Sequence, residues 1–317
     1  MRARSEIIRA SPCPASPGDD HDTTRPSLLR PVEALAQLPY HVIRPIDPGS
    51  PLVLSSPHSG SVYPRAFIES SRLDFATLRR SEDCFVDQLF ADAPDHHVPL
   101  LAADFPRVYC DANREPWELD PAMFAEKLPA WCNTRTTRVL AGFGTIARLV
   151  SSGEPIYAMP LSFAEAEARV HGCWHPYHAA LAELIRETFD RFRCCTLLDC
   201  HSMPGERGDP RAAGLDSDFV LGDAYGTSCA PILIQTAHRF LEAAGFRVRR
   251  NDPYAGGYVT RHYGRPRQGI HTLQIEISRA LYLEQKSYQK LPGFDRIRKL
   301  MSELVRVLAD TSRTLIP

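Results

Sequence analysis

The sequence predicts a three-layer α/β/α fold with a mixed, largely parallel central sheet. Short apolar segments typical of buried strands alternate with longer segments whose apolar residues recur at helical spacing. This alternation favours a sheet that is covered by helices on both faces. Unusual polar residues follow several of the apolar segments, and the carboxyl ends of strands are where ligands bind in such sheets.

The predicted strands end at polar or turn residues, and the predicted helices carry an apolar stripe. The strands lie in residues 51–56, 99–105, 194–205 (running into a loop), 218–223, 246–250 and 271–278. The helices are expected over residues 74–91, 155–193, 230–246 and 293–309. Ser162 is a predicted N-cap, with Glu165 completing a capping box, and Gly245 closes the third helix. Residues 251–264 are predicted to form a loop rich in Gly and Tyr.

Length and composition indicate a large folded domain preceded by a tail. The chain has 317 residues, of which 44% are hydrophobic and 24% charged, within the ordinary globular range. Residues 1–30 are rich in Pro, Ser, Asp and Arg and lack periodic apolar positions, so we expect them to be disordered. Residues 31–317 are expected to form a single domain.

Charge and motifs exclude several function classes. Lys plus Arg number 37 against 38 Asp plus Glu, so no global field attracts nucleic acid or an anionic membrane. No apolar stretch approaches the ~18 residues that span a bilayer, and the N-terminus lacks the apolar core of a signal peptide, so we expect a cytoplasmic protein. The nine cysteines include no C-x-x-C pair, which argues against a disulfide framework. Dinucleotide, nucleoside triphosphate and serine-hydrolase motifs are missing from the sequence.

Clusters of polar residues end or interrupt the apolar segments, and they suggest a metal site. They are Pro57–Gly60, Ser81–Asp83, Asp199–Ser202 and Gln274–Ile277. Two histidines and a carboxylate are the ligands of a catalytic zinc site, with a further carboxylate as base. A single histidine at a strand end is more often structural, and Asp199 and Ser202 could be turn formers. Glu276 is harder to dismiss, because a carboxylate in the strand LQIEI would be buried and needs a partner.

Cationic residues provide candidate substrate contacts. An arginine fork grips a carboxylate in two places and Asn113 beside Arg114 adds a donor, although a surface salt bridge would also explain the pair. A basic run lies in a segment with glycines and tyrosines and consists of Arg261, His262, Arg265 and Arg267. A Gly-hinged loop that binds an anionic substrate fits this run better than nucleic-acid binding does. Cys200 has no designated base that would make it a nucleophile.

Together these segments resemble the N-formylglutamate amidohydrolase family, a branch of the zinc carboxypeptidase-like superfamily. The resemblance covers residues 52–283 and rests on SSPHSGSVYP, SEDCFVDQLF, RVYCDANREP, LLDCHSMPG, DFVLGD, NDPYAGGYVTRHYG and HTLQIEISRALY in order. It implies a zinc carboxypeptidase/phosphorylase-like fold and a Zn²⁺ ion held by His58, His201 and an acidic residue of the second motif. Family members usually have Thr-Asp-Trp-His-Val-Asp at residues 82–87, so Asp83 is the expected ligand and Glu82 the alternative.

The resemblance also implies roles for the remaining candidates. Glu276 matches the general base, and Asn113 and Arg114 match a pair that binds the substrate's α-carboxylate. Arg261 and His262 would be further substrate contacts that stabilise the developing oxyanion.

The expected reaction is zinc-dependent hydrolysis of an N-formyl or N-acyl acidic amino acid, with N-formyl-L-glutamate as the best candidate. Departures from the family pattern at Cys84 and Phe85 leave the substrate open. Another N-acyl amino acid or a peptide end is an alternative, as is a non-catalytic ligand-binding relative. The expected partner is a small acidic N-acyl amino acid, and the sequence leaves open whether the chain forms a homo-oligomer.

Overall fold

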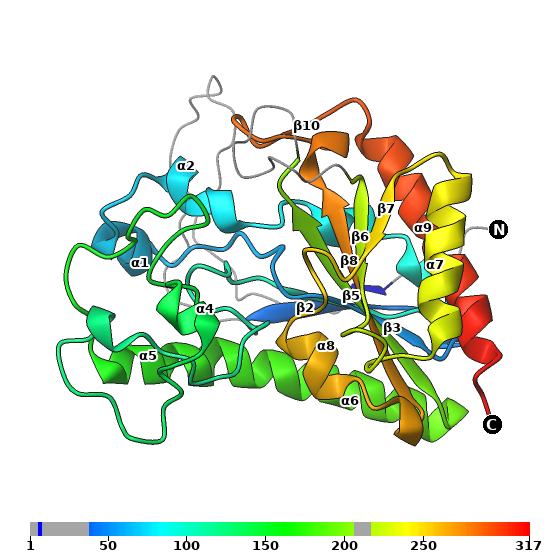
Figure 1. The fold of residues 1–317 in the computed structure, drawn as a ribbon, viewed down its shortest axis with the longest axis horizontal. Helices are drawn as coiled ribbons and strands as arrows, with labels where there is room; N and C mark the ends of the chain where they lie inside the picture. Colours follow the sequence, from blue (N-terminus) through cyan, green and yellow to red (C-terminus); the bar gives the residue numbers. More distant parts are fainter. Residues whose placement is uncertain (1–5, 8–37, 206–216) are drawn as a thin grey trace, which may run out of the picture.

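A mixed sheet forms the centre of the computed structural model, which describes residues 6–7, 38–205 and 217–317 (Figure 1). Its strand order is β1-β2-β4-β3-β5-β8-β6-β7. The neighbouring strands β4, β3, β5 and β8 are parallel, whereas β2 is antiparallel to β4 and β6 is antiparallel to β8. The predicted fold class is therefore confirmed.

The strands are short, and the longest of them lie at the centre of the sheet. They are β1 (Glu6–Ile7), β2 (Tyr40–Arg44), β3 (Leu52–Ser56), β4 (Leu100–Ala103), β5 (Cys195–Met203), β6 (Phe219–Gly222), β7 (Val248–Arg250) and β8 (Ile270–Ser278), with a separate hairpin of β9 (Leu283–Glu284) and β10 (Gln289–Lys290). The predicted disordered tail lies outside the described residues except at β1, which pairs with β2.

Helices of very different length surround the sheet. They are α1 (Arg65–Ser70), α2 (Phe75–Leu78), α3 (Val86–Leu89), α4 (Thr137–Leu140), α5 (Phe163–Arg169), α6 (His175–Phe192), α7 (Pro231–Ala243), α8 (Tyr258–Tyr263) and α9 (Phe294–Arg313). Short 3-10 turns lie at Arg79–Ser81, Ala93–His96, Pro121–Met123, Pro266–Gln268 and Arg279–Leu281. Within the described ranges, no helix combines the length and apolarity needed to cross a membrane.

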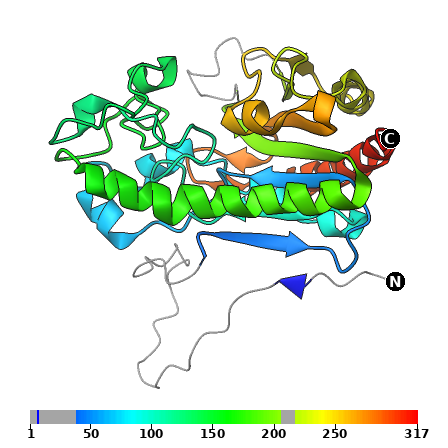
Figure 2. The same cartoon turned by 90° about the horizontal axis from the view of Figure 1, so that it is seen from below.

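The two faces of the sheet are covered by different helices. α6 lies along one face, while α7 and α9 cover the other (Figures 1 and 2). Strand geometry explains this arrangement, because successive side chains point to opposite faces. Leu52 and Leu54 pack in the core that contains α7 and α9, and Val53 packs in the core that contains α6.

The segment predicted as one helix over residues 74–91 is interrupted. It contains α2, a 3-10 turn and α3, separated by extended or left-handed residues. The backbone N–H of Asp83 donates to the carbonyl of His58 at 3.0 Å, and Phe85 has a φ of 64°. Periodicity could not reveal this break, because it depends on a contact with a distant loop. Its consequence is that Asp83 lies against the end of β3.

Other predicted elements differ mainly at their ends. The Ser162 hydroxyl accepts a hydrogen bond from the Glu165 N–H, so the predicted cap is confirmed, but residues 155–162 precede the helix. α5 continues into α6 through a π-helical turn, Val170–Trp174. The loop predicted over residues 251–264 contains α8, which its glycines concealed.

His178 on α6 fastens the helix to two segments that reach the polar end of the sheet. Its Nε2 lies 2.8 Å from the carbonyl oxygen of Ala112, and its Nδ1 lies 2.9 Å from the hydroxyl of Tyr263. The ring stacks on Trp174 with 3.8 Å between centroids. Burial lowers the pKa of the imidazole to about 4, so His178 is neutral in the folded protein at pH 7.

We expect the free energy of unfolding to fall by about 2 kcal/mol more between pH 7 and pH 5 in the natural protein than in a His178→Gln variant. The unfolded imidazole takes up a proton below its pKa of ~6.5, whereas the buried one resists protonation until about pH 4. Stability is therefore present above the unfolded pKa and is lost as the pH falls toward the folded one. Denaturant unfolding at both pH values measures it.

The matched control is His171→Gln, which removes an exposed imidazole from the preceding turn. It should keep the pH dependence of the natural protein. Identical pH dependence of the natural protein and the His178→Gln variant would contradict this role of His178.

Candidate active site

Four polar residues of β5 and β8 share one face of the sheet. Asp199 and His201 are two positions apart on β5, and Gln274 and Glu276 are two positions apart on β8, so the side chains of each pair point to the same side. The parallel register places His201 opposite Glu276 and Asp199 opposite Gln274. The apolar residues between them face α7 and α9, so the polar face points toward α6 and α8.

A tight loop after β3 contributes His58 to the same end of the sheet. The loop passes so close to the end of β4 that a Cβ on Gly60 would lie 2.1 Å from the carbonyl oxygen of Phe105. Glycine is therefore required at this position. The His58 carbonyl also accepts the N–H of Asp83, so the loop and the break between α2 and α3 are held together.

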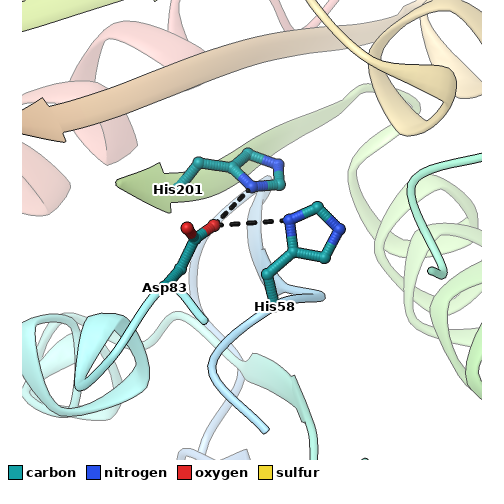
Figure 3. A group of neighbouring side chains, drawn as sticks. All are labelled: His58, Asp83 and His201. Atoms are coloured by element: carbon teal, nitrogen blue, oxygen red, sulfur yellow. Dashed lines mark hydrogen bonds and ion pairs between the residues drawn. The ribbon is translucent and has the colours of Figure 1, made fainter. Parts of the chain in front are cut away.

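His58, Asp83 and His201 converge on one point (Figure 3). Asp83 Oδ2 lies 3.3 Å from His58 Nδ1 and 3.1 Å from His201 Nδ1. One ligand atom from each of the three residues lies within 4.8 Å of the others, and all three side chains are buried. Two imidazole nitrogens and a carboxylate oxygen form a ligand set that suits a divalent metal ion.

A second layer of acidic residues contacts the far sides of the two rings. His58 Nε2 lies 2.7 Å from Asp111 Oδ1. His201 Nε2 lies 3.1 Å from Asp199 Oδ1, without hydrogen-bond alignment, and 3.0 Å from the side-chain nitrogen of Asn113. Carboxylates in this position fix the tautomer of metal-binding histidines, leaving Nδ1 as the ligand atom.

Asp83 and its neighbour Glu82 point in different directions. Asp83 Oδ1 accepts hydrogen bonds from Arg279 and Ser202, which turns Oδ2 toward the histidines. Both oxygens of Glu82 are engaged elsewhere, by Tyr63, Arg79 and Cys84. The structure thus brings Asp83, and not the alternative Glu82, to the histidines.

Two observations indicate that His58, Asp83 and His201, the trio, could hold a metal ion. His58 Nδ1 is buried and has no aligned hydrogen-bond partner, so its lone pair is available to a ligand. Although burial opposes it, the carboxylates of Asp199 and Asp83 raise the pKa of His201 well above its usual value. An environment that favours a proton on His201 would also favour a cation at the point where the three side chains meet.

Glu276 lies beside the trio with a fixed orientation. Its Oε1 accepts a hydrogen bond of 2.9 Å from Gln274 Nε2. Gln274 Oε1 in turn accepts the N–H of Gly257, so the amide cannot rotate without losing this bond. Burial raises the pKa of Glu276 to about 7, with Asp83 adding to the rise and His201 opposing it. A carboxylate with a pKa near neutrality is suited to exchange protons during catalysis.

A cavity of about 480 Å³ opens onto these groups. Among the residues that the structure describes, the acidic side chains in its wall are Asp83 and Glu276. The described basic residues of the wall outnumber them and are Arg107, Arg114, Arg138, Arg261 and Arg279. This imbalance favours an anionic ligand.

Asn113 and Arg114 line the cavity, but much of their hydrogen-bonding capacity is used within the protein. Asn113 Oδ1 accepts the N–H of Val259 at 2.8 Å, which fastens the start of α8. A Cβ on Gly257 would lie 2.3 Å from Asn113 Nδ2, so glycine permits this approach. Arg114 donates to the carbonyls of Phe143 and Asn113.

The two candidates from the basic run, Arg261 and His262, are neighbours on α8, but only one of them lines the cavity. Arg261 is exposed and lines the cavity. His262 is not part of the cavity wall, and its ring stacks on Tyr258 with 4.8 Å between centroids. The structure therefore brings Arg261 toward the trio but does not bring His262 there.

Sequence reasoning missed several groups that the structure places around the trio. Asp111 and Arg107 both belong to the quoted segment RVYCDANREP, but nothing in its pattern connects them to His58. Asp199 was weighed as a turn former, although its spacing of two from His201 in a strand puts both on one face. Arg279 belongs to the quoted segment HTLQIEISRALY, whose pattern does not connect it to Asp83, and Arg138 lies outside every quoted segment.

Comparisons with known proteins agree on one family. The sequence model of N-formylglutamate amidohydrolase matches residues 50–283. An N-formylglutamate deformylase of Pseudomonas putida is 28% identical over 238 residues, 74% of this chain and 82% of that protein. The protein of the same name from Pseudomonas aeruginosa is 28% identical over 240 residues, 75% of this chain and 84% of the relative.

Solved structures agree with this assignment. The crystal structure of N-formylglutamate amidohydrolase from Ralstonia eutropha JMP134 matches with a TM-score of 0.81 and 35% identity, covering 88% of this chain and 99% of that one. A gene product of Agrobacterium tumefaciens, 19% identical, matches with a TM-score of 0.61, covering 87% and 96% of the two chains, and supports the fold alone.

We expect Asp83→Asn to abolish stoichiometric zinc binding and Glu82→Gln to retain it. The first change removes the negative charge from the point where the histidines meet, whereas the second alters a carboxylate that faces Tyr63 and Arg79. Metal content after equilibration and dialysis, measured by mass spectrometry, separates the two. Unfolding temperatures of both variants show whether each remains folded, and full zinc content in folded Asp83→Asn would contradict the ligand assignment.

Proposed function

The chain belongs to the N-formylglutamate amidohydrolase family, and on that premise we propose that it hydrolyses N-formyl-L-glutamate to formate and L-glutamate. The observation that carries this proposal is the convergence of His58, Asp83 and His201 beside Glu276 in a cationic cavity. An acidic N-formyl amino acid supplies both the amide bond and the negative charge that such a cavity accommodates. Residues 31–317 would form the catalytic domain of a cytoplasmic enzyme.

The proposed cofactor is Zn²⁺, which would be held by His58, His201 and Asp83, the residues whose Nδ1 atoms and carboxylate face one another. Two histidines and one carboxylate are a frequent ligand set of catalytic zinc sites, which keep a position for water or substrate. When bound, the ion supplies a Lewis acid that polarises the amide carbonyl and lowers the pKa of water. Asp111 and Asp199 would hold the two imidazoles in the orientation that binding requires.

Glu276 is the proposed general base and then the general acid. Its carboxylate accepts a proton from the attacking water, whose oxygen forms a bond to the formyl carbon. The C–N bond then breaks, and Glu276 returns the proton to the departing amine nitrogen. The second proton of the water, which remains on the formic acid, passes to the free amine, so that formate and glutamate with a protonated amine leave with atoms and charge balanced. The hydrogen bond from Gln274 holds the carboxylate in place during both transfers.

Different arginines of the cavity wall would bind different negative groups of the substrate and the transition state. Arg107 Nη2 donates to Asp111, and Arg107 retains further N–H groups that line the cavity near Asp83 and Glu276. This position suits stabilisation of the oxygen that becomes negative in the transition state. Asn113 and Arg114 remain the proposed contacts of the α-carboxylate, with Arg114 Nη2 as the donor least engaged within the protein.

The direct test is formate release from N-formyl-L-glutamate by the purified enzyme. We expect release to stop after treatment with a chelator and to return when zinc is added, because the three ligands would hold the Lewis acid. N-acetyl-L-glutamate and formylated dipeptides, assayed in parallel, examine the alternative substrates. Zinc-dependent cleavage of those compounds without formate release from N-formyl-L-glutamate would overturn the substrate but not the reaction class.

We expect Glu276→Gln to lower kcat by about 100- to 10,000-fold, the usual contribution of general acid–base catalysis. The amide keeps the size of the side chain but cannot accept the proton. Zinc content should be unchanged, because Glu276 is outside the trio. Turnover close to that of the natural enzyme, at full zinc content, would refute the role of Glu276.

A further inference from the structure

Two arginines of the cavity wall lack an ion-pair partner among the described residues. Arg279 is paired with Asp83, and Asp111 lies within ion-pair distance of both Arg107 and Arg114. Arg138 and Arg261 have neither an ion pair nor a side-chain hydrogen bond with any residue in the described part of the chain. Both guanidinium groups line the cavity, and the described residues use none of their N–H donors.

Arg138 and Arg261 come from different parts of the fold and meet at the cavity. Arg138 is the second residue of α4, whose start is capped by the hydroxyl of Thr136. Arg261 lies on α8, whose start is held by Asn113. Burial lowers the pKa of Arg138, with Asp111 and Glu118 opposing this and the charges of Arg261 and Arg107 adding to it. Two like charges held close together, one of them partly buried, favour an anion between them.

The substrate class of the proposed function carries two carboxylates, and the protein offers separate donors for each. The proposed function assigns the α-carboxylate to Arg114, which lines the same cavity as Glu276. That assignment leaves Arg138 and Arg261 for the carboxylate at the end of the side chain. Their planar forks can each give two hydrogen bonds to a carboxylate, which a neutral side chain could not use.

We propose that Arg138, together with Arg261, binds the side-chain carboxylate of the substrate and so selects acidic over neutral N-formyl amino acids. This inference rests on the proposed function. Arg138 is then a specificity-determining residue, and its loss should affect one class of substrate only. The segment around α4 would be the part of the chain that decides which amino acid is accepted.

The experiment compares N-formyl-L-glutamate with N-formyl-L-glutamine, which has the same shape without the side-chain charge. Arg138→Gln should raise KM for N-formyl-L-glutamate about 10- to 100-fold, the worth of a hydrogen-bonded charge, and leave KM for N-formyl-L-glutamine unchanged. Arg138→Lys should restore part of the loss, because charge is retained without the planar fork. Arg135→Gln, an exposed arginine three positions earlier, is the matched control and should behave as the natural enzyme.

Equal loss with both substrates would overturn the inference, because Arg138 would then serve the α-carboxylate or the fold. Unchanged kinetics with N-formyl-L-glutamate would overturn it as well. Calorimetric binding of L-glutamate and L-glutamine to the zinc-loaded protein separates this result from failure of the proposed reaction. Arg138-dependent preference for L-glutamate without formate release would sustain the inference and refute the reaction, whereas formate release without that preference would do the opposite.

Discussion

The carboxylate of Asp83, shared between His58 and His201, is the interaction on which the rest of the site depends. A buried negative charge is costly unless it is paired and hydrogen-bonded. Arg279 and Ser202 bind one oxygen of Asp83, and the two imidazoles face the other. Although burial opposes it, these partners hold the pKa of Asp83 well below its usual range. The break between α2 and α3 follows from this requirement, since an unbroken helix could not present Asp83 to the end of β3.

The two faces of the central sheet have different roles, because successive side chains of a strand point to opposite faces. On the face toward α7 and α9, β5 and β8 contribute Leu198, Cys200, Leu273, Ile275 and Ile277, whose burial stabilises the fold. On the opposite face lie Asp199, His201, Gln274 and Glu276, which contact one another and the loop residues Asn113 and Gly257. Hydrogen bonds link α8 to Asn113 and Gln274, and so to His201 and Glu276. The proposed base Glu276 and the proposed metal ligand His201 are therefore both held by contacts with the start of α8. Catalytic groups need such rigid positioning.

The sequence allowed prediction of those parts of the site that lie in regular elements. Glu276 was recognisable because a carboxylate inside an apolar strand must have a partner, and the strands around His58 and His201 followed from their apolar runs. The break before Asp83, helix α8 and the partners of Asn113 depend on contacts between distant segments, so local patterns could not predict them. Arg138 is the clearest example, because only the folded chain brings α4 to the cavity wall.

The proposed chemistry requires one metal ion between Nδ1 of both histidines and the Asp83 carboxylate. A crystal structure of the zinc-loaded protein, with anomalous diffraction at the zinc edge, tests this most directly. We expect a single strong peak ~2.0–2.1 Å from both Nδ1 atoms and ~2.0–2.2 Å from an Asp83 oxygen, with Asp111 still facing the Nε2 of His58. A peak bonded through Nε2, or one at the Glu82 carboxylate, would contradict it.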